Sequence, residues 1–278
     1  MEIRPRIWML LVSFLIATGL FLGLRQGIIF SSDYIDVLVL GIDSPEGFKA
    51  RSDSINLVRI DYSRNRIGIL AIPRDTMVDI PGHGKDKINH AHFFGGPELS
   101  CAAVSKLLNI PVRYYIQLNF PVFVRLIDDL GGITLDVEKP LNYDDYAADL
   151  HIHLRSGPQR LSGYQAMGYM RFRHDNASDW GRIDRQHRFF KAVVSELGDP
   201  RNFVRLPYIL YGSSSGIGTN LDMSQIMKIS MRVPSIYKNG NVETGFVPGQ
   251  DIIIAGVYYT MPDKKSLKAL ERKVLFGQ

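Results

Sequence analysis

The sequence predicts an α/β fold: a single layered domain with a central mixed β-sheet flanked by helices, preceded by one N-terminal transmembrane helix. Two observations support the domain. Short apolar runs alternate along the chain with segments of helical periodicity, which is the pattern of a sheet covered by helices. No internal repeat, low-complexity tract or shift in composition divides the chain after its N-terminal segment. A third observation, an uncharged apolar stretch near the N-terminus, supports the transmembrane helix.

Apolar runs predict three strands in the first part of the domain. The run 36–42 (DVLVLGI) is continuously apolar, as a buried strand would be. The runs 55–60 and 66–72 are separated by a short polar turn. Residues 81–84 are rich in proline and glycine and predict a loop. The next expected elements are helix 97–108, strand 112–118, helix 121–130, which stops at Gly131 and Gly132, and strand 133–137.

The second part of the domain begins with a long polar stretch, 142–157, to which we assign neither helix nor strand. Helical spacing of Ile183, Phe190 and Val194 then predicts a helix over 182–197, with His187 as an ordinary residue of one helix face. The other expected elements are helices 162–169, 222–231 and 264–274 and strands 242–247 and 251–257.

The N-terminal stretch 7–24 (IWMLLVSFLIATGLFLGL) carries no charge and approaches the ~20 residues that span a bilayer. No small-residue cleavage site follows, so we expect an uncleaved anchor rather than a cleaved signal peptide or a buried helix. Arg4 and Arg6 precede the span and acidic residues soon follow it, which places the N-terminus in the cytoplasm. The expected organisation of this single-pass cell-membrane protein is a cytoplasmic tail 1–6, an anchor 7–29, a linker 30–35 and an extracytoplasmic domain 36–278.

A single cysteine and a mild positive charge narrow the chemistry. Cys101 cannot form an internal disulfide and leaves no cysteine-based zinc site. A small core residue on a helix is its favoured interpretation, with a nucleophile as the alternative. The chain has no Walker-type phosphate loop and no Gly-x-Ser-x-Gly motif. The net charge of +5 favours an anionic ligand only if the cations converge in one cleft.

Arginines are concentrated in one segment of the second half of the chain. Arg171 and Arg173 alternate around Phe172, so in an extended segment both guanidinium groups would face one side. Arg182 and Arg185 are three residues apart on an expected helix, in its first turn, where free backbone N–H groups favour an anion. Arginine binds phosphate oxygens in pairs through its planar fork. The alternative is a solvated basic helix with surface salt bridges.

Charged residues also stand at the ends of the predicted strands, where ligand sites of α/β sheets lie. Asp43 follows the first strand and Asp53 precedes the second, with Arg51 beside it, while Arg74 and Asp75 follow the third. Two carboxylates at adjacent strand ends can bind Mg²⁺, which in turn would bridge phosphate oxygens. The alternatives are a helix or turn cap at Asp53 and an Asx turn at Asp43.

Paired histidines are a weaker signal. His90 and His92 have the i, i+2 spacing of possible metal ligands, but no third ligand is nearby in the sequence, which favours an ordinary loop. His151 and His153 lie in the polar stretch, and we interpret them as structural.

Seven segments, in order and spacing, resemble the LytR–CpsA–Psr family of bacterial envelope proteins. They are DVLVLGID at 36–43, RSDS at 51–54, LAIPRDT at 70–76, GKDKINHAHFFGGPE at 84–98, NFPVFVRLIDDLGGI at 119–133, GPQRLSGYQAMGYMRFRHD at 157–175 and DWGRIDRQ at 179–186. Each motif alone is weak, but seven in order are highly specific. Trp180 stands where the family commonly has phenylalanine and Ser54 where it commonly has threonine; neither difference removes a charged group.

The resemblance implies a glycan phosphotransferase that uses Mg²⁺ (or Mn²⁺). Its donor would be a polyprenyl-diphosphate-linked glycan and its acceptor a peptidoglycan hydroxyl. Asp43 and Asp53 would contact the metal, one of them is the candidate general base, and Arg74 would join them as a catalytic residue. The groups implied to bind the diphosphate or complete its shell are Arg51, Arg74, Arg171, Arg173, Arg182, Arg185, Gln186 and Asp75.

Three other functions could use these residues. A polyprenyl-diphosphate pyrophosphatase would use the same site with water as acceptor. A non-catalytic envelope protein that carries or senses polyprenyl phosphates would need the arginines but not the acidic pair. A transcriptional regulator is disfavoured because the expected anchor places the domain outside the cell. Nucleic acid is also disfavoured because aromatic residues are not interleaved with the arginines as a stacking platform.

Overall fold

The fold was analysed in a computed structural model of the chain, in which the described residues are 33–42, 50–146, 150–172, 178–199, 202 and 217–278. The expected anchor 7–29, Asp43 and Arg173 lie outside these residues, as do the side chains of 178–184. The segment Ile35–Gln278 forms one compact unit. Within the described residues, no helix is long and apolar enough to cross a membrane.

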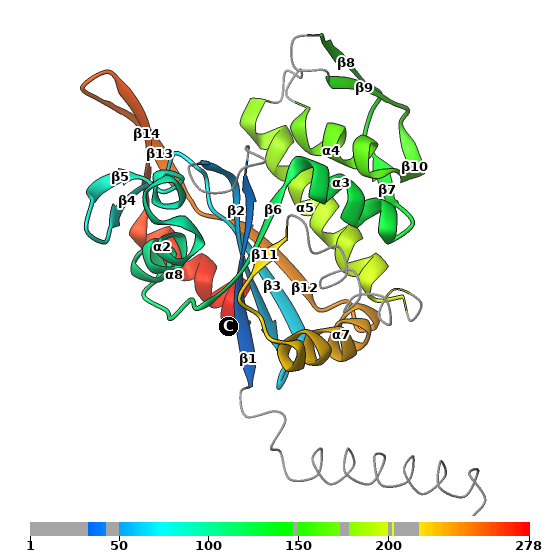
Figure 1. The fold of residues 1–278 in the computed structure, drawn as a ribbon, viewed down its shortest axis with the longest axis horizontal. Helices are drawn as coiled ribbons and strands as arrows, with labels where there is room; N and C mark the ends of the chain where they lie inside the picture. Colours follow the sequence, from blue (N-terminus) through cyan, green and yellow to red (C-terminus); the bar gives the residue numbers. More distant parts are fainter. Residues whose placement is uncertain (1–32, 43–49, 147–149, 173–177, 200–201, 203–216) are drawn as a thin grey trace, which may run out of the picture. The chain divides into compact units, whose positions relative to one another are not determined.

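A six-stranded mixed sheet is the centre of this unit, in the order β11-β6-β1-β2-β3-β12 (Figure 1). β1 pairs in parallel with β6, and β3 pairs in parallel with β12. β2 pairs antiparallel with β3, and β11 antiparallel with β6. The prediction of a central mixed sheet is therefore confirmed. The strands are β1 Tyr34–Ile42, β2 Ser52–Asp61, β3 Arg66–Ala71, β6 Tyr114–Asn119, β11 Gly218–Thr219 and β12 Val242–Phe246.

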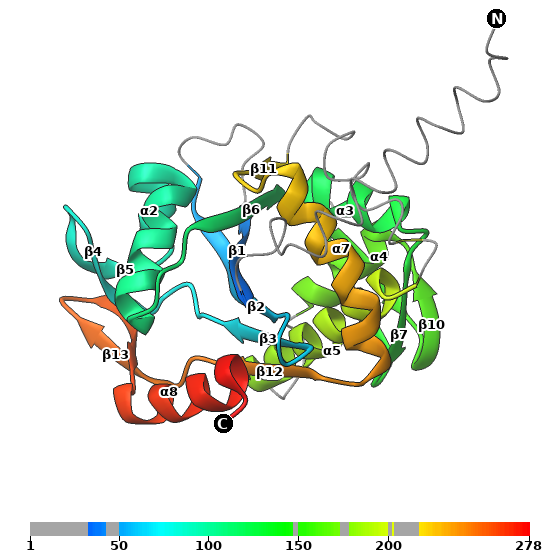
Figure 2. The ribbon, with the colours of Figure 1, turned by 90° about the horizontal axis from the view of Figure 1, so that it is seen from below.

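Helices cover both faces of the sheet because alternate residues of its strands are apolar on both sides. Leu38 and Leu40 of β1 pack in one core cluster with Val104 of α2 and with α8. Val37 lies on the other face, in a cluster with Ile226 of α7 and with α5. Figure 2 shows α2 and α8 on one side of the sheet and α7 and α5 on the other. These helices are α2 His90–Leu108, α5 Ser178–Leu197, α7 Met223–Lys238 and α8 Lys264–Glu271, which continues as the π-helical turn η1 Arg272–Phe276.

A second cluster of elements follows β6, the strand that leads into α3. Its core includes Ile127, Ile133 and Tyr169, all essentially inaccessible to solvent. α3 and α4 cross closely here, since a Cβ on Gly163 would lie 2.1 Å from the carbonyl oxygen of Val124. Only glycine permits that contact. The elements are α3 Phe120–Asp129, β7 Ile133–Val137, β8 Leu141–Asp145, β9 Leu150–Leu154, β10 Gly157–Leu161 and α4 Gly163–Arg171.

Two hairpins complete the unit, and an isolated bridge from Thr76 to Thr260 joins them. The first is formed by β4 Met77–Ile80 and β5 Gly84–Lys87, the second by β13 Gly249–Ile254 and β14 Val257–Pro262. The loop expected at 81–84 overlaps the turn of the first hairpin, and the single strand expected at 251–257 is part of the second. The polar stretch 142–157 contains most of β8 and β9, whose pairing we did not predict.

Two helix starts and one helix end differ from the prediction. α5 begins at Ser178 rather than 182, and α7 extends to Lys238, beyond the expected end at 231. α2 begins at His90, leaves helical geometry at Gly95 and Gly96, and resumes at Pro97, where the prediction began. Proline suits that position because its missing N–H has no helical partner in a first turn.

Candidate active site

The carboxyl ends of four strands meet at one edge of the central sheet. Ile42 of β1 pairs with Asn119 of β6, and Ala71 of β3 pairs with Phe246 of β12. Because β2 is antiparallel to β3, it begins at this edge. The three predicted site residues Asp53, Arg74 and Asp75 therefore share this edge, where ligands of α/β sheets bind.

Arg74 is the centre of a charged cluster at the carboxyl edge. Its Nη1 donates to Asp53 Oδ1 at 2.7 Å, and its Nε lies 3.5 Å from Asp75 Oδ2. Lys87 Nζ donates to Asp75 Oδ1 at 2.6 Å. Partial burial acts to lower the pKa of Arg74, but the hydrogen bonds and charges of Asp53 and Asp75 outweigh it and raise that pKa. Arg74 is thus a permanent cation, and about two-fifths of its side chain is open to a ligand.

Backbone hydrogen bonds fix the loop that carries Arg74 and Asp75. The Arg74 carbonyl accepts from the N–H of Asn89, immediately before α2. The Asp75 carbonyl accepts from the N–H of Thr260 in β14 at 2.9 Å. The two hairpins and the start of α2 therefore position these side chains. We did not predict Lys87 as part of the cluster, although it lies in the family-like segment 84–98.

Arg51 is exposed at the same edge, directly before β2. Its neighbour Ala50 is buried, and the Ala50 carbonyl accepts a hydrogen bond from Nδ1 of His92 at 2.7 Å. The other ring nitrogen of His92, Nε2, lies 2.9 Å from Oε1 of Gln117 in β6. His92 is completely buried. It is therefore neither a loop residue nor a metal ligand, but a link between α2, β6 and the segment that presents Arg51.

We expect His92→Phe to weaken binding of an anionic ligand at this edge more than it lowers the maximal rate of any reaction there. The ring size is kept, but the buried Ala50 carbonyl and Gln117 amide lose their partners, at about 1–3 kcal/mol each. Arg51 would then lose its fixed position. Steady-state kinetics and urea unfolding test this, with His90→Phe as the control because His90 is partly exposed and pairs with Asp86. An unchanged KM in His92→Phe would remove His92 from the positioning of Arg51.

Arg171 reaches the same edge from the second cluster of elements. It is the last residue of α4, and its guanidinium lies over the ring of Phe120 at 4.9 Å. Phe120 directly follows the end of β6. Phe172 is buried, as expected, but Arg171 belongs to a helix and not to an extended segment.

Arg185 is directed into the protein interior. Its side chain is 1% exposed, its Nη1 donates to Glu138 Oε1 at 3.1 Å, and its Nη2 donates to the Phe172 carbonyl at 2.9 Å. The hydroxyl of buried Tyr169 donates to the other oxygen of Glu138 at 3.0 Å. This geometry favours a structural role for Arg185, which holds the end of α4 beside Arg171, rather than the expected contact with the diphosphate.

Replacing Arg185 with methionine is expected to destabilise the fold by about 3 kcal/mol, because removing one partner of a buried ion pair leaves the other uncompensated. Glu138 is 23% exposed, so water compensates it in part. Urea unfolding measures the loss. The companion variant Glu138→Gln, which keeps one of the two acceptor oxygens, should lose less. Wild-type stability in Arg185→Met would show that the buried network is not needed for the fold.

The start of α5 changes the interpretation of Arg182 and Arg185. Because α5 begins at Ser178, neither Arg182 nor Arg185 is in its first turn. The argument from free N–H groups at the helix start therefore does not apply to either residue. Gln186 is partly buried on the same helix. The side chain of Arg182 lies outside the described residues.

The acidic residues at the edge are compatible with Mg²⁺. Among the described residues, no three His, Cys, Asp or Glu side chains form a metal-binding group, and Asp43 lies outside them. Mg²⁺ needs only one or two carboxylates when water and substrate phosphates complete its shell. Asp53 provides such a carboxylate, since Arg74 engages its Oδ1 and the side chain is 38% exposed. The residues present thus fit the ion.

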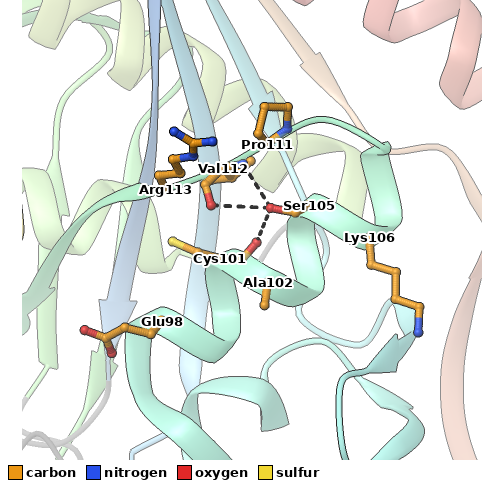
Figure 3. Close-up of a pocket in the computed structure, with 8 residues that line it drawn as sticks. All are labelled: Glu98, Cys101, Ala102, Ser105, Lys106, Pro111, Val112 and Arg113. Carbon is orange, nitrogen blue, oxygen red and sulfur yellow. Dashed lines mark hydrogen bonds between the residues drawn. The ribbon is translucent and has the colours of Figure 1, made fainter.

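Cys101 lies elsewhere and is a core residue, as expected. Burial, and then the charge of Glu98, raise the pKa of its thiol to about 12, so it is not a nucleophile at neutral pH. It lines a shallow pocket with Ser105 and Arg113, shown in Figure 3. Arg113 precedes β6, which places this pocket at the amino end of that strand, away from the carboxyl edge.

The fold and its charged edge define an α/β domain equipped to bind an anionic ligand. The LytR_cpsA_psr family model matches residues 28–274, and the chain belongs to this family, which confirms the resemblance seen in the sequence. It is 36% identical over 199 residues to the regulatory protein MsrR of Staphylococcus aureus, a match that covers 71% of this chain and 59% of the relative. The chain thus matches less than two thirds of the length of that relative.

Other relatives match over most of their length. Polyisoprenyl-teichoic acid–peptidoglycan teichoic acid transferase TagU of Bacillus cereus is 34% identical over 247 residues, with 87% of this chain and 78% of the relative covered. Among solved structures, B. subtilis TagV has a TM-score of 0.75 at 26% identity, covering 89% of this chain and 99% of that one. TagT bound to LIIa-WTA has a TM-score of 0.71 at 29% identity, covering 87% and 91%.

Proposed function

We propose that this protein transfers a glycan phosphate from a polyprenyl-diphosphate-linked donor to a peptidoglycan hydroxyl. The observation that carries the proposal is Arg74, a cation paired with Asp53 and Asp75 at the carboxyl edge of the sheet. Arg51 and Arg171 add positive charge at the same edge. The name of the TagU relative, a teichoic acid transferase that acts on peptidoglycan, supports a transferase of this kind.

The reaction exchanges one phosphorus–oxygen bond for another. The acceptor hydroxyl oxygen attacks the phosphorus that carries the glycan, and the bond from that phosphorus to the bridging oxygen of the diphosphate breaks. The glycan phosphate becomes a phosphodiester on peptidoglycan, and polyprenyl phosphate leaves with the bridging oxygen. Such transfers depend on positioning and on neutralising charge over the phosphate oxygens.

Each residue of the edge has a part in that exchange. Arg74 and Arg51 bind the diphosphate oxygens and stabilise the charge that grows on the leaving phosphate. An aspartate, Asp53 or Asp43, accepts the proton of the attacking hydroxyl. Mg²⁺, bound by the same aspartates and the phosphates, would supply further charge neutralisation. Lys87 holds Asp75, which in turn orients Arg74.

The proposal includes the membrane location expected from the sequence. The uncharged stretch 7–24 would tether the domain outside the cell, on the side where peptidoglycan lies. A tether also keeps the domain close to a lipid-linked donor, which raises the effective concentration of that donor.

The full-length chain, purified and supplied with a lipid-linked glycan, peptidoglycan and Mg²⁺, should join glycan to peptidoglycan. Chelation with EDTA should stop the reaction, and Mg²⁺ or Mn²⁺ should restore it. Mass spectrometry of the purified protein should also detect a bound polyprenyl lipid. Transfer that continues at full rate in EDTA would contradict the metal assignment, and no transfer under any of these conditions would contradict the proposed function.

A further inference from the structure

The β13–β14 hairpin projects from the body of the domain in Figure 1. Its tip is apolar and open to solvent: Ile253 is 73% exposed, Ile254 47% and Val257 43%. Tyr258 and Met261 are also exposed. From residue 252 to residue 262 no side chain carries a charge. The tip therefore has the composition of a core but is not covered by the described part of the domain.

Such a tip is a liability in water. Exposed hairpins rich in β-branched residues pair with other chains unless charges or proline interrupt them. Here no charge interrupts the strands near the turn at Ala255 and Gly256. An apolar surface of this kind marks a site of contact with a partner or a membrane.

The helix that follows the hairpin is basic and indicates which occupant fits. α8 starts two residues after β14 ends and carries exposed Lys264, Lys265 and Lys268. Buried Leu267 anchors the opposite side of the helix. At helical spacing the three lysines lie within about 100° of one another around the axis, so they form one basic stripe. Basic side chains at the base of an apolar hairpin match an anionic lipid surface.

The hairpin is also joined to the candidate active site. The N–H of Thr260 donates to the Asp75 carbonyl at 2.9 Å. Lys87, the partner of Asp75, lies over the rings of Tyr258 and Tyr259 at 5.9 and 5.7 Å. Whatever binds the hairpin is therefore held at a fixed place relative to the loop of Arg74.

We propose that the tip of the β13–β14 hairpin inserts into the interfacial layer of an anionic phospholipid bilayer, with the basic stripe of α8, at the base of the hairpin, attracted by the negative charge of the lipid headgroups. Thr260, which is bonded to Asp75, is the fourth residue of β14 from the turn, so it lies roughly 13 Å from the tip. Insertion by about 5–10 Å would leave Asp75 within about 10 Å of the surface, within reach of a glycan diphosphate on a membrane lipid. The insertion itself does not depend on the proposed function. Only its purpose, to hold the candidate active site near a lipid-linked donor, rests on that function.

Site-specific labelling of the full-length chain tests the insertion. Cys101 is the only cysteine, so Cys101→Ala provides a background into which Ile253→Cys is introduced. The matched control is Tyr146→Cys, at a residue 84% exposed outside the hairpin. An environment-sensitive dye is attached, and the chain is placed in nanodiscs of phosphatidylcholine with or without phosphatidylglycerol.

With phosphatidylglycerol, the dye at position 253 should shift to shorter wavelength and become protected from iodide, whereas the dye at 146 should not. The double variant Lys264→Glu, Lys268→Glu should reduce that protection. A dye at 253 that stays open to iodide in both nanodiscs overturns the inference. So does a dye that responds only to soluble peptidoglycan fragments, which would make the hairpin part of an acceptor site, or only to an added protein.

Transfer measurements separate this inference from the proposed function. Ile253→Asp should lower transfer from a donor embedded in the nanodisc by roughly tenfold, since a charge on the tip opposes insertion. Transfer from a short-chain, water-soluble donor should not change. Insertion without any transfer would refute the proposed function alone, and equal transfer from the embedded donor in Ile253→Asp would refute the role of the tip.

Discussion

Arg74→Ala is expected to lower glycan transfer by about 10³-fold, the effect of removing an arginine that stabilises charge in phosphoryl transfer. Arg74 has the position for this role, because its guanidinium lies at the carboxyl edge with Asp53 and Asp75 as partners. In a bound complex the diphosphate would take over part of that hydrogen bonding. The fold should survive, since an exposed ion pair contributes only about 0–1 kcal/mol.

Two further variants distinguish charge from geometry at this position. Arg74→Lys keeps the positive charge but loses the planar fork, and it should recover only part of the activity. Arg64→Ala is the matched control: Arg64 is 53% exposed and pairs with Asp61 at 3.1 Å, but it lies in the turn between β2 and β3, at the opposite end of these strands. If Arg74→Ala transferred glycan as fast as Arg64→Ala, the site would not include Arg74.

Asp53→Asn is expected to reduce transfer by about 10²- to 10³-fold, the range found when a group that acts on the reacting centre is lost. The substitution keeps the size of the side chain and one oxygen that can accept from Arg74. It removes the negative charge that would bind Mg²⁺ or accept the acceptor proton. Raising the concentration of Mg²⁺ should restore part of the activity if Asp53 is a metal ligand.

Asp79→Asn provides the comparison for this variant. Asp79 also pairs with a cation at 2.7 Å, Lys106, and is half exposed, but it belongs to the β4–β5 hairpin. The Asp79→Asn variant should transfer glycan at the wild-type rate. A double-mutant cycle of Asp53→Asn with Arg74→Ala should show strong non-additivity, as for residues that act as a unit. Additive effects, or a fully active Asp53→Asn, would contradict the shared site.

The part of this site that lies at strand ends could be predicted from the sequence. Buried strands are recognisable as apolar runs, and charged residues at their ends must lie at an edge of the sheet. Asp53, Arg74 and Asp75 follow that rule. His92 and Gln117 do not, because their contact joins a helix start to a strand 25 residues later, and nothing in local spacing indicates it.

Other features depended on long-range contacts as well. Arg182 and Arg185 have the spacing of one helix face, but the burial of Arg185 results from Glu138, 47 residues away. The β8–β9 pair was missed although β9 has the period-two pattern of a half-buried strand: Leu150, Ile152 and Leu154 are buried, while polar residues alternate with them. The second hairpin was predicted as one strand because its turn at Ala255 and Gly256 contains no polar turn former.

The fate of a single phosphorus atom tests the proposed function most directly. A donor labelled with radioactive phosphorus only in the phosphate attached to the glycan is incubated with the full-length chain, Mg²⁺ and peptidoglycan. Phosphotransfer predicts that the label moves to peptidoglycan in a form resistant to phosphomonoesterase, while unlabelled polyprenyl phosphate is released. Label that appears instead on a free glycan phosphate would show that water is the acceptor and would contradict the transferase assignment.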